Sequence, residues 1–247
     1  MKNDIRDFME KFEQIRNLGY VKAVNNDFSG IGLTFESLLG KSVDNFPLPD
    51  FNNTLEIKTK LAYSTRPLHL FKLTPEGNNF YEMKKIVEKY GYYNSENRDN
   101  KVFNGCVRAG MLEKIGLFYY FSLEVNYKEE RIKLLVYDIN KRLIDNTTYW
   151  DFEKIENALK RKLEYLVLVD VWPTERNGEK YYKYYRYSIY KYSNVYTFLS
   201  LVEKGIISIT FSVGLYNSAD KLGRIHDHGT SFDIKKEDLR QLFYQVV

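Results

Sequence analysis

The residues best suited to chemistry lie in one short segment, Pro49 to Lys58, which reads PDFNNTLEIK. Side chains two residues apart on a strand point to the same face, so Glu56 and Lys58 would lie side by side. Asp50, in the preceding turn, can fold back to bring its carboxylate beside Glu56. Two carboxylates in a small site hold Mg²⁺ well, together with water and phosphate oxygens. A lysine beside the metal can position a water molecule and offset charge in the transition state. This set of groups suits hydrolysis of a phosphodiester.

The alternative is an exposed edge strand that carries an incidental Glu-x-Lys, a common tripeptide. Two features favour the chemical interpretation. Glu56, Lys58 and Lys60 place three charges on one face of a strand whose other face is apolar, so the charged face must meet solvent or a ligand. A glycine-rich turn and a short helix carrying Glu36, a possible third acidic group, also precede the segment.

Two of the three histidines lie in the segment from Lys221 to Thr230, KLGRIHDHGT. A zinc or iron site would need more ligands than this segment offers, and His69 is the only further histidine. The residues alone leave two interpretations open, a hydrogen-bonded turn or a loop that reads DNA bases. In the second, the imidazoles would donate to guanine and Asp227 would accept from a base amino group. His69 is left open in the same way, between a partly buried histidine and a DNA contact.

Hydrophobic periodicity and turn residues predict a mixed α/β fold, with a central mixed sheet flanked by helices. Helices are expected at 5–18, 34–39, 81–90, 150–163 with Asp151 as the cap, 195–202 and 234–243. Strands are expected at 54–60, 68–73, 117–125, 132–137, 165–171, 181–192 and 206–213. The first two strands could pair antiparallel, and Asn177-Gly178 is a hairpin signal before the aromatic strand 181–192.

Composition sets broad limits on the class of protein. The 247 residues are 44% hydrophobic and 28% charged, which is typical of a globular protein with one substantial core. The net charge of +4 and the pI of about 8.8 permit a polyanionic partner without requiring one. No signal peptide or membrane-spanning run is recognisable, and the single cysteine, Cys106, suits a reducing cytoplasm.

Several blocks of the sequence, taken in order, resemble the MvaI/BcnI restriction endonucleases, which belong to the MutH-like branch of the PD-(D/E)xK nucleases. These blocks are 30–39 (GIGLTFESLL), 49–51 with 56–59 (PDF, EIKT), 144–150 (IDNTTYW), 179–184 (EKYYKY) and 226–230 (HDHGT). The resemblance spans almost the whole chain with little change in spacing. It implies a restriction-endonuclease-like fold and a single nuclease domain over residues 1–247. Within that domain we expect a catalytic lobe over about 1–140 and a DNA-recognition lobe over about 141–247.

The resemblance further implies that Asp50 and Glu56 bind Mg²⁺, replaceable by Mn²⁺, that Lys58 contacts the attacking water, and that Glu36 supports the site. The expected activity is that of a type II restriction endonuclease on double-stranded DNA, leaving a 5′-phosphate and a 3′-hydroxyl. A MutH-like nicking enzyme and an inactive DNA-binding protein are the alternatives. We expect a cytoplasmic monomer whose host carries a cognate methyltransferase, without a stable complex between the two.

The same resemblance favours base readout for the histidine segment. The expected DNA-contact residues are His226, Asp227, His228, Arg224, Lys221, Lys60 and His69, with Lys235 and Lys236 as further phosphate candidates. One departure stands out. Family members that cut at CC(A/T)GG carry arginines where this chain has Ser212 and Asp233. Arginine paired to guanine is the commonest specific contact, so this protein is expected to read a different target.

Overall fold

The computed structural model describes residues 2–27, 29–40, 48–77, 79–93, 101–215, 225–227 and 230–247. They fall into two compact units that interleave along the chain. The first unit comprises Met1–Arg66, Leu159–Ser193 and Phe243–Val247, and the second comprises Pro67–Ala158 and Asn194–Leu242. The division differs from the single boundary expected near residue 140, because strands from later in the chain complete the sheet that the N-terminal part begins.

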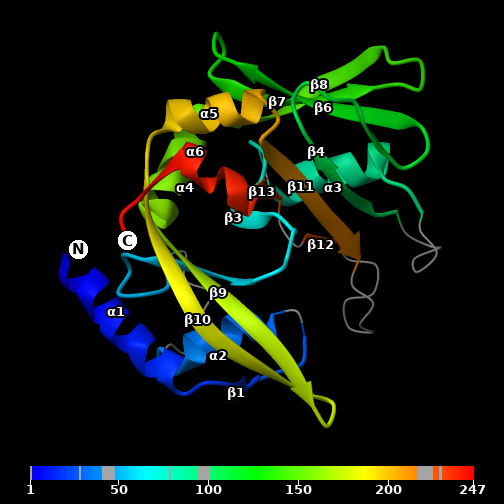
Figure 1. The fold of residues 1–247 in the computed structure, drawn as a ribbon. Helices are drawn as coiled ribbons and strands as arrows, with labels where there is room; N and C mark the ends of the chain where they lie inside the picture. Colours follow the sequence, from blue (N-terminus) through cyan, green and yellow to red (C-terminus); the bar gives the residue numbers. More distant parts are fainter. Residues whose placement is uncertain are drawn as a thin grey trace. The chain divides into compact units, whose positions relative to one another are not determined.

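The first unit is built on a five-stranded sheet. Its helices are α1 (Lys2–Asn17), α2 (Gly30–Leu38) and the end of α4 (Phe152–Leu163). Its strands are β1 (Val21–Lys22), β2 (Glu56–Leu61), β9 (Tyr165–Arg176), β10 (Glu179–Tyr192) and β14 (Phe243–Gln245). The order is β1-β10-β9-β2, with β14 also paired to β10. Figure 1 shows β1, β9 and β10 of this sheet. Because β2 runs parallel to β9 while β10 runs antiparallel to it, the sheet is mixed, as predicted.

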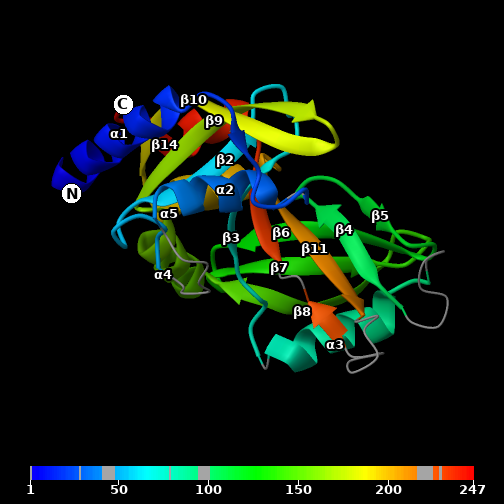
Figure 2. The same cartoon turned by 90° about the horizontal axis from the view of Figure 1, so that it is seen from below.

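The two faces of this sheet differ in character because side chains alternate along a strand. One face is apolar and packs against α1 and α2. Its core includes Ile57 of β2, Val167 and Val169 of β9, and Phe12 and Phe35 of the helices. Figure 2 shows α2 lying against β2 and β9. The opposite face of β2 carries the charged side chains, which are therefore kept apart from the apolar core.

The hairpin that joins β9 to β10 confirms the prediction from Asn177-Gly178. Both residues have positive φ, 53° and 76°, which a two-residue turn of this kind requires and which asparagine and glycine tolerate. Arg176 pairs with Glu179 across the turn. The register set here carries through the long ribbon of β9 and β10, with a shift between Tyr184 and Arg186.

The start of α2 is fixed by a small hydrogen-bond network. The Thr34 hydroxyl donates to the Gly30 carbonyl oxygen at 2.6 Å and accepts from the backbone N–H of Val24 at 3.0 Å. Tyr184 of β10 donates its hydroxyl to the Ile31 carbonyl oxygen at 2.8 Å. The glycine-rich turn is thereby tied to the sheet, and α2 is held beside β2.

The second unit contains two antiparallel sheets, ordered β12-β11-β13-β3, with β4 paired to β11, and β5-β6-β7-β8. Its strands are β3 (Leu68–Lys72), β4 (Phe103–Val107), β5 (Glu113–Ile115), β6 (Tyr119–Asn126), β7 (Arg131–Tyr137), β8 (Leu143–Asp151), β11 (Ile207–Leu215), β12 (Ile225–Asp227) and β13 (Ser231–Ile234). Its helical elements are α3 (Asn79–Tyr90), α5 (Val195–Glu203), the 3-10 helix η1 (Lys236–Asp238), α6 (Leu239–Leu242) and the start of α4. Within the part of the chain that the structure describes, no helix is long and apolar enough to cross a membrane.

Two expectations about strand pairing and helix limits are wrong. The strands at 54–60 and 68–73 do not pair with each other: β2 pairs with β9 and β3 pairs with β13. Trp150 and Asp151 do not open a helix but end β8, and α4 begins at Phe152. The Trp150 side chain is fully buried and donates its ring N–H to the Leu73 carbonyl oxygen, a contact that fixes this residue in the strand.

The closing helix expected at 234–243 is also wrong. Ile234 belongs to β13, where it pairs with both Ile207 and Leu68, and Phe243 begins β14. Only the short η1 and α6 lie between them. All four residues of β13 are buried, which a helix with one apolar face could not provide.

Two glycines of α2 make a matched pair for a stability test. A Cβ added at Gly30 would lie 2.4 Å from the Asn25 carbonyl oxygen, so the backbone would have to shift, whereas one at Gly32 would meet only ordinary contacts. We expect Gly30→Ala to lower the free energy of unfolding by about 1–3 kcal/mol. Gly32→Ala should be neutral or slightly stabilising. Urea unfolding of both variants measures the difference, and equal stability of the two would contradict the described turn.

Candidate active site

Asp50 is brought to the start of β2 by a tight turn. The backbone N–H of Phe51 donates to the Leu55 carbonyl oxygen at 3.0 Å, and Asn52 and Asn53 take positive φ values of 50° and 56°. Asparagine tolerates this left-handed region better than most residues. The Asp50 carboxylate accepts the backbone N–H of Ile57 at 2.9 Å, so the folding back expected from the sequence places it next to Glu56.

Glu56 is a buried carboxylate, with 1% of its side chain exposed. Its Oε1 lies 2.6 Å from the Lys58 Nζ and 3.7 Å from the Lys162 Nζ. Its Oε2 is buried without a hydrogen-bond partner among the described residues. Burial raises the pKa of Glu56; the two lysines oppose this effect, and the neighbouring charge of Asp50 adds to it. A carboxylate oxygen that is desolvated and unpartnered is suited to receive a cation.

Lys58 and Lys60 point to the same face as Glu56 but differ in environment. Lys58 remains 27% exposed and can reach a bound substrate. Lys60 is buried, and its Nζ donates to the Arg66 carbonyl oxygen. Its partner across the sheet, Asp170, is also buried and accepts two hydrogen bonds from Arg186. Lys60 was expected to contact DNA. In the structure its ammonium group is buried and is taken up by this hydrogen bond within the first unit.

Glu36 lies on α2, the helix that packs against β2. A Cβ placed on Gly32 would be 3.7 Å from the Thr59 Oγ1 and 3.8 Å from the Glu36 Oε1, so both side chains border this glycine. Thr59 alternates with Lys58 and Lys60 along β2 and therefore faces the helix. These contacts place Glu36 beside the middle of β2, where it can support the strand that carries the site.

Lys162 is a site residue that the sequence analysis missed. It comes from α4, more than a hundred positions after Glu56, and its side chain is 33% exposed. The spacing of residues along α4 could have indicated Lys162. Lys162 follows the buried Ile155 and Leu159 by seven and three residues, which places a cation on the edge of the buried face of the helix.

The donor set fits Mg²⁺. Asp50 and Glu56 supply two carboxylates, and Mg²⁺ in phosphate-processing sites takes one or two such ligands with water and phosphate oxygens completing the shell. Within the described ranges there is no cluster of three or more His, Cys, Asp or Glu side chains that could hold a metal by protein ligands alone. Two carboxylates leave most of an octahedral shell to water and phosphate oxygens, so this donor set suits a cation that shares its ligands with a substrate.

The histidine segment is described only in part. Ile225–Asp227 form β12, in which His226 pairs with Gly214 and Asp227 pairs with Val213 of β11. Lys221, Arg224 and His228 lie outside the described residues. This pairing shows that Ile225–Asp227 extend the sheet of β11.

His69 is oriented by a buried acid in the second unit. Its Nδ1 lies 2.7 Å from Asp233 Oδ1 and 3.2 Å from Ser231 Oγ, across the pairing of β3 with β13. Asp233 is only 3% exposed, whereas the His69 side chain is 66% exposed. Both partners engage Nδ1, so Nε2 is the ring nitrogen left to meet a ligand. Ser212, the other position where the sequence analysis expects arginine in relatives, stands on β11 opposite Asn104.

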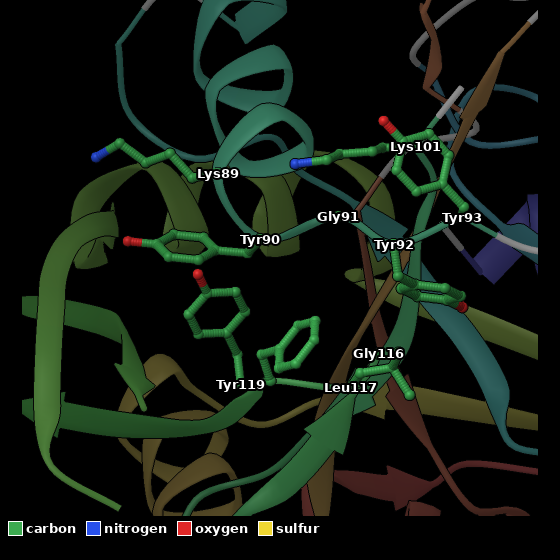
Figure 3. Close-up of a pocket in the computed structure, with 10 residues that line it drawn as sticks. Lys89, Tyr90, Gly91, Tyr92, Tyr93, Lys101, Gly116, Leu117 and Tyr119 are labelled. Carbon is green, nitrogen blue, oxygen red and sulfur yellow. The ribbon is translucent and has the colours of Figure 1, made fainter. Parts of the chain in front are cut away.

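A cavity of about 500 Å³ lies elsewhere in the second unit, between the end of α3 and the β5–β6 hairpin. Figure 3 shows Tyr90 and Tyr119 at one end of it and Tyr92 and Tyr93 at the other. Tyr90 donates its hydroxyl to Asp145 of β8 at 2.5 Å. The lining contains none of the residues predicted to act on DNA. Asp145, from one of the blocks that carry the family resemblance, therefore has a structural role in joining α3 to β8.

Two carboxylates and a lysine at the beginning of a sheet strand define a class of site that suits phosphodiester hydrolysis. The chain matches the model of the MvaI/BcnI restriction endonuclease family over residues 9–243, and it belongs to that family. The expected family and the mixed α+β fold are thereby confirmed. Membership in a restriction endonuclease family implies nuclease activity on DNA.

Two solved structures are similar over almost their full length. The complex of restriction endonuclease MvaI with its cognate DNA substrate is 28% identical, with 100% of each chain covered and a TM-score of 0.91. Restriction endonuclease MvaI in the absence of DNA is 27% identical, with 99% of this chain and 97% of that chain covered and a TM-score of 0.63. A comparison with curated proteins found no match.

The contacts of Asp145 predict a pH-dependent contribution to stability. Burial alone would raise its pKa, but hydrogen bonds from Tyr90 and Thr147 outweigh this and lower the pKa to about 2. A lowered carboxyl pKa stabilises the fold above the unfolded value near 3.8, and this contribution is lost as the pH falls toward 2. Asp145→Asn should therefore cost about 1–2 kcal/mol at pH 7 and progressively less below pH 4. Urea unfolding at several pH values measures this. The exposed Asp27→Asn is the control, and a cost for Asp145→Asn that did not change with pH would contradict the assignment.

Proposed function

We propose that the protein is a type II restriction endonuclease of the PD-(D/E)xK class, MutH-like branch, which hydrolyses double-stranded DNA at a specific site and depends on Mg²⁺. The observation that carries this proposal is the convergence of Asp50, Glu56 and Lys58 at the start of β2. The match to a complex of restriction endonuclease MvaI with DNA supports duplex DNA as the substrate.

Asp50 and Glu56 would hold the Mg²⁺ ion, which, when bound, neutralises phosphate charge and makes a bound water more acidic. Lys58 directs its ammonium group at the attacking water and holds it in line with the scissile bond. The water oxygen forms a new bond to phosphorus while the bond from phosphorus to the 3′ oxygen breaks. The proton reaches that oxygen through solvent, leaving a 5′-phosphate and a 3′-hydroxyl. Glu36, on the helix beside β2, would support the residues that hold the metal.

The second unit supplies candidates for sequence recognition. The segment with His226, Asp227 and His228 would read base edges, and Lys221 and Arg224 would contact phosphates. His69, whose imidazole ring is oriented by Asp233, is a further candidate for base contact. Its neighbour Asp233 stands where family members that cut CC(A/T)GG carry arginine, and its buried carboxylate is occupied by His69. A target different from CC(A/T)GG follows from this exchange.

A restriction role also implies a setting for the enzyme. It would act in the cytoplasm as a monomer with one active site, cutting the two strands in separate events. A cognate methyltransferase would protect the host DNA without forming a stable complex with the nuclease.

The catalytic assignment predicts cleavage of plasmid DNA in Mg²⁺ or Mn²⁺, a discrete band pattern, and no cleavage with a chelator. Lys58→Ala should slow single-turnover cleavage by about 10²–10³-fold, because a positioned charge at the reacting phosphate is lost. Lys128→Ala, on the exposed turn between β6 and β7, should leave the rate unchanged. Full activity of Lys58→Ala would overturn the catalytic assignment.

The same digest separates the alternatives. Relaxed circles that never become linear would favour a nicking enzyme. Specific DNA binding without cleavage in any divalent cation would favour an inactive DNA-binding protein. Sequencing of the ends gives the recognition site and the cut position.

His69 is expected to contribute to specificity. Holding Nδ1–H on Asp233 leaves Nε2 as an acceptor when the ring is neutral and a donor when it is protonated. His69→Ala should therefore weaken discrimination at one base-pair position by about 1–3 kcal/mol, measured on a library of randomised sites. Lys72→Ala, on the same strand but exposed on its other face, is the control. Unchanged discrimination in His69→Ala would remove this residue from the recognition surface.

A further inference from the structure

Three aromatic side chains form a cluster on the surface of the first unit. Trp172 of β9 lies between Tyr63, in the turn after β2, and Tyr185 of β10, at ring-centroid distances of 6.3 and 5.6 Å. These are the distances of interacting aromatic pairs. Trp172 is 42% exposed and Tyr63 is 64% exposed. A single exposed ring is ordinary in a soluble protein, but a contiguous cluster of rings open to water is typical of a binding surface.

The cluster lies on the face of the sheet that carries the catalytic lysine. The pairing of β2 with β9 places Lys58 beside Leu168. Trp172 follows Leu168 by four positions and therefore points to the same face, because side chains alternate along a strand. A strand rises by about 3.3 Å per residue, so the cluster begins about 13 Å along the sheet from Lys58. This distance is the rise of about four nucleotides in a DNA duplex.

Two cations border the aromatic cluster. Lys183 of β10 is the direct partner of Trp172 across the strands, so their side chains share a face. The Arg186 guanidinium lies 5.8 Å from the centre of the Tyr185 ring, and its side chain is 61% exposed. Two of its five N–H groups donate to the buried Asp170 carboxylate, which fixes the direction of the planar group. The surface therefore offers rings and positive charge together.

This combination fits the backbone of DNA. Arginine, lysine and tyrosine side chains are common contacts of phosphate and sugar groups, and a flat ring can pack against a deoxyribose. The cations match the charge of a phosphate chain. Continuity with the face that carries Lys58 decides the partner, because DNA held at that lysine would extend over the cluster within about four nucleotides.

We propose that Tyr63, Trp172, Tyr185, Lys183 and Arg186 form a flank-binding surface, which holds the sugar–phosphate backbone of duplex DNA about four nucleotides from the bond that is cut. This inference rests on the proposed function and extends it. The first unit then contributes affinity that does not depend on base sequence, in addition to the base readout proposed for the second unit.

Tryptophan fluorescence tests this surface directly. The chain has two tryptophans, and Trp150 is fully buried, so Trp172 is the one that bound DNA can cover. In Ca²⁺, a duplex with the target site and long flanks should shield wild-type emission from acrylamide about twofold, and Trp172→Phe should lose this shielding. Acrylamide quenching that did not change when the wild-type protein is saturated with duplex would overturn the proposal. Equal shielding by a single strand would also contradict it, since that indicates stacking on unpaired bases.

Flank length separates these contacts from contacts to the site itself. The site is placed in duplexes with about two or about ten flanking base pairs on each side, and the wild-type protein should bind the longer duplex about 10-fold more tightly. Trp172→Ala should lose most of this difference and should bind the shorter duplex within about threefold of wild type. Trp172→Phe, which keeps a flat ring, should retain it. The control is Tyr244→Ala, an aromatic residue of β14 in the same sheet that is 68% exposed, and it should behave as wild type.

The charge of Lys183 gives a second, independent measurement. On the longer duplex, Lys183→Gln should lower the slope of log affinity against log salt concentration by about 1, because one phosphate contact is lost. On the shorter duplex the slope should not change. Lys191→Gln, an exposed lysine at the other end of β10, is the matched control. Equal loss of slope in Lys191→Gln would show a general effect of strand charge and refute the inference.

A merely structural role and a failure of the proposed function give different results. A variant that only destabilises the unit would have a lower melting temperature and would bind both duplexes more weakly by the same factor, which refutes a flank contact. If the wild-type protein cleaves DNA while Trp172→Ala and Lys183→Gln match it on both duplexes, only the flank-binding surface is refuted. If the wild-type protein neither binds nor cleaves any DNA, the proposed function is refuted as well.

Discussion

Burial of the Glu56 carboxylate is the constraint on which the first unit depends. A charged group removed from water is costly unless cations accompany it. Here they come from the same strand, through Lys58, and from α4, through Lys162. The pairing of β2 with β9 and the approach of α4 therefore stabilise the buried Glu56 carboxylate as well as the packing of the unit. The cost that remains is visible in the raised pKa of Glu56 and in its unpartnered Oε2.

The sheet of the first unit separates two tasks by the alternation of its side chains. Ile57 and the valines of β9 anchor α1 and α2, and this apolar layer gives the strand its rigidity. The intervening positions carry the charges, including the buried Asp170, which accepts hydrogen bonds from the exposed Arg186. A rigid strand is a good support for chemistry because it fixes the directions of its side chains more closely than a loop does. In the second unit the same principle holds for His69, which a buried partner on the neighbouring strand orients.

Local signals in the sequence predicted most elements and the core of the site. The opening helix, the Asn177-Gly178 hairpin and the buried strand that precedes it follow from periodicity and turn chemistry within a few residues. The turn that carries Asp50 also followed from local spacing. The partner of β2 did not, because parallel pairing joins residues more than a hundred positions apart. Trp150 and Ile234 were assigned to helices for a related reason: their strand conformation is imposed by burial against distant neighbours. Lys162 escaped notice because its significance depends on a contact with Glu56 that no sequence window contains.

The chain passes between its two units four times, after residues 66, 158, 193 and 242. No single cut separates them, so neither can be exchanged as a cassette between relatives by one crossover. In such an architecture, individual substitutions on fixed strands are the simplest route to a new sequence preference. The pair of His69 on β3 and Asp233 on β13, held across neighbouring strands, has the form that such a change would take. Attempts to redesign the target would accordingly do better to vary pairs of facing side chains on β3, β11 and β13 than to graft whole segments.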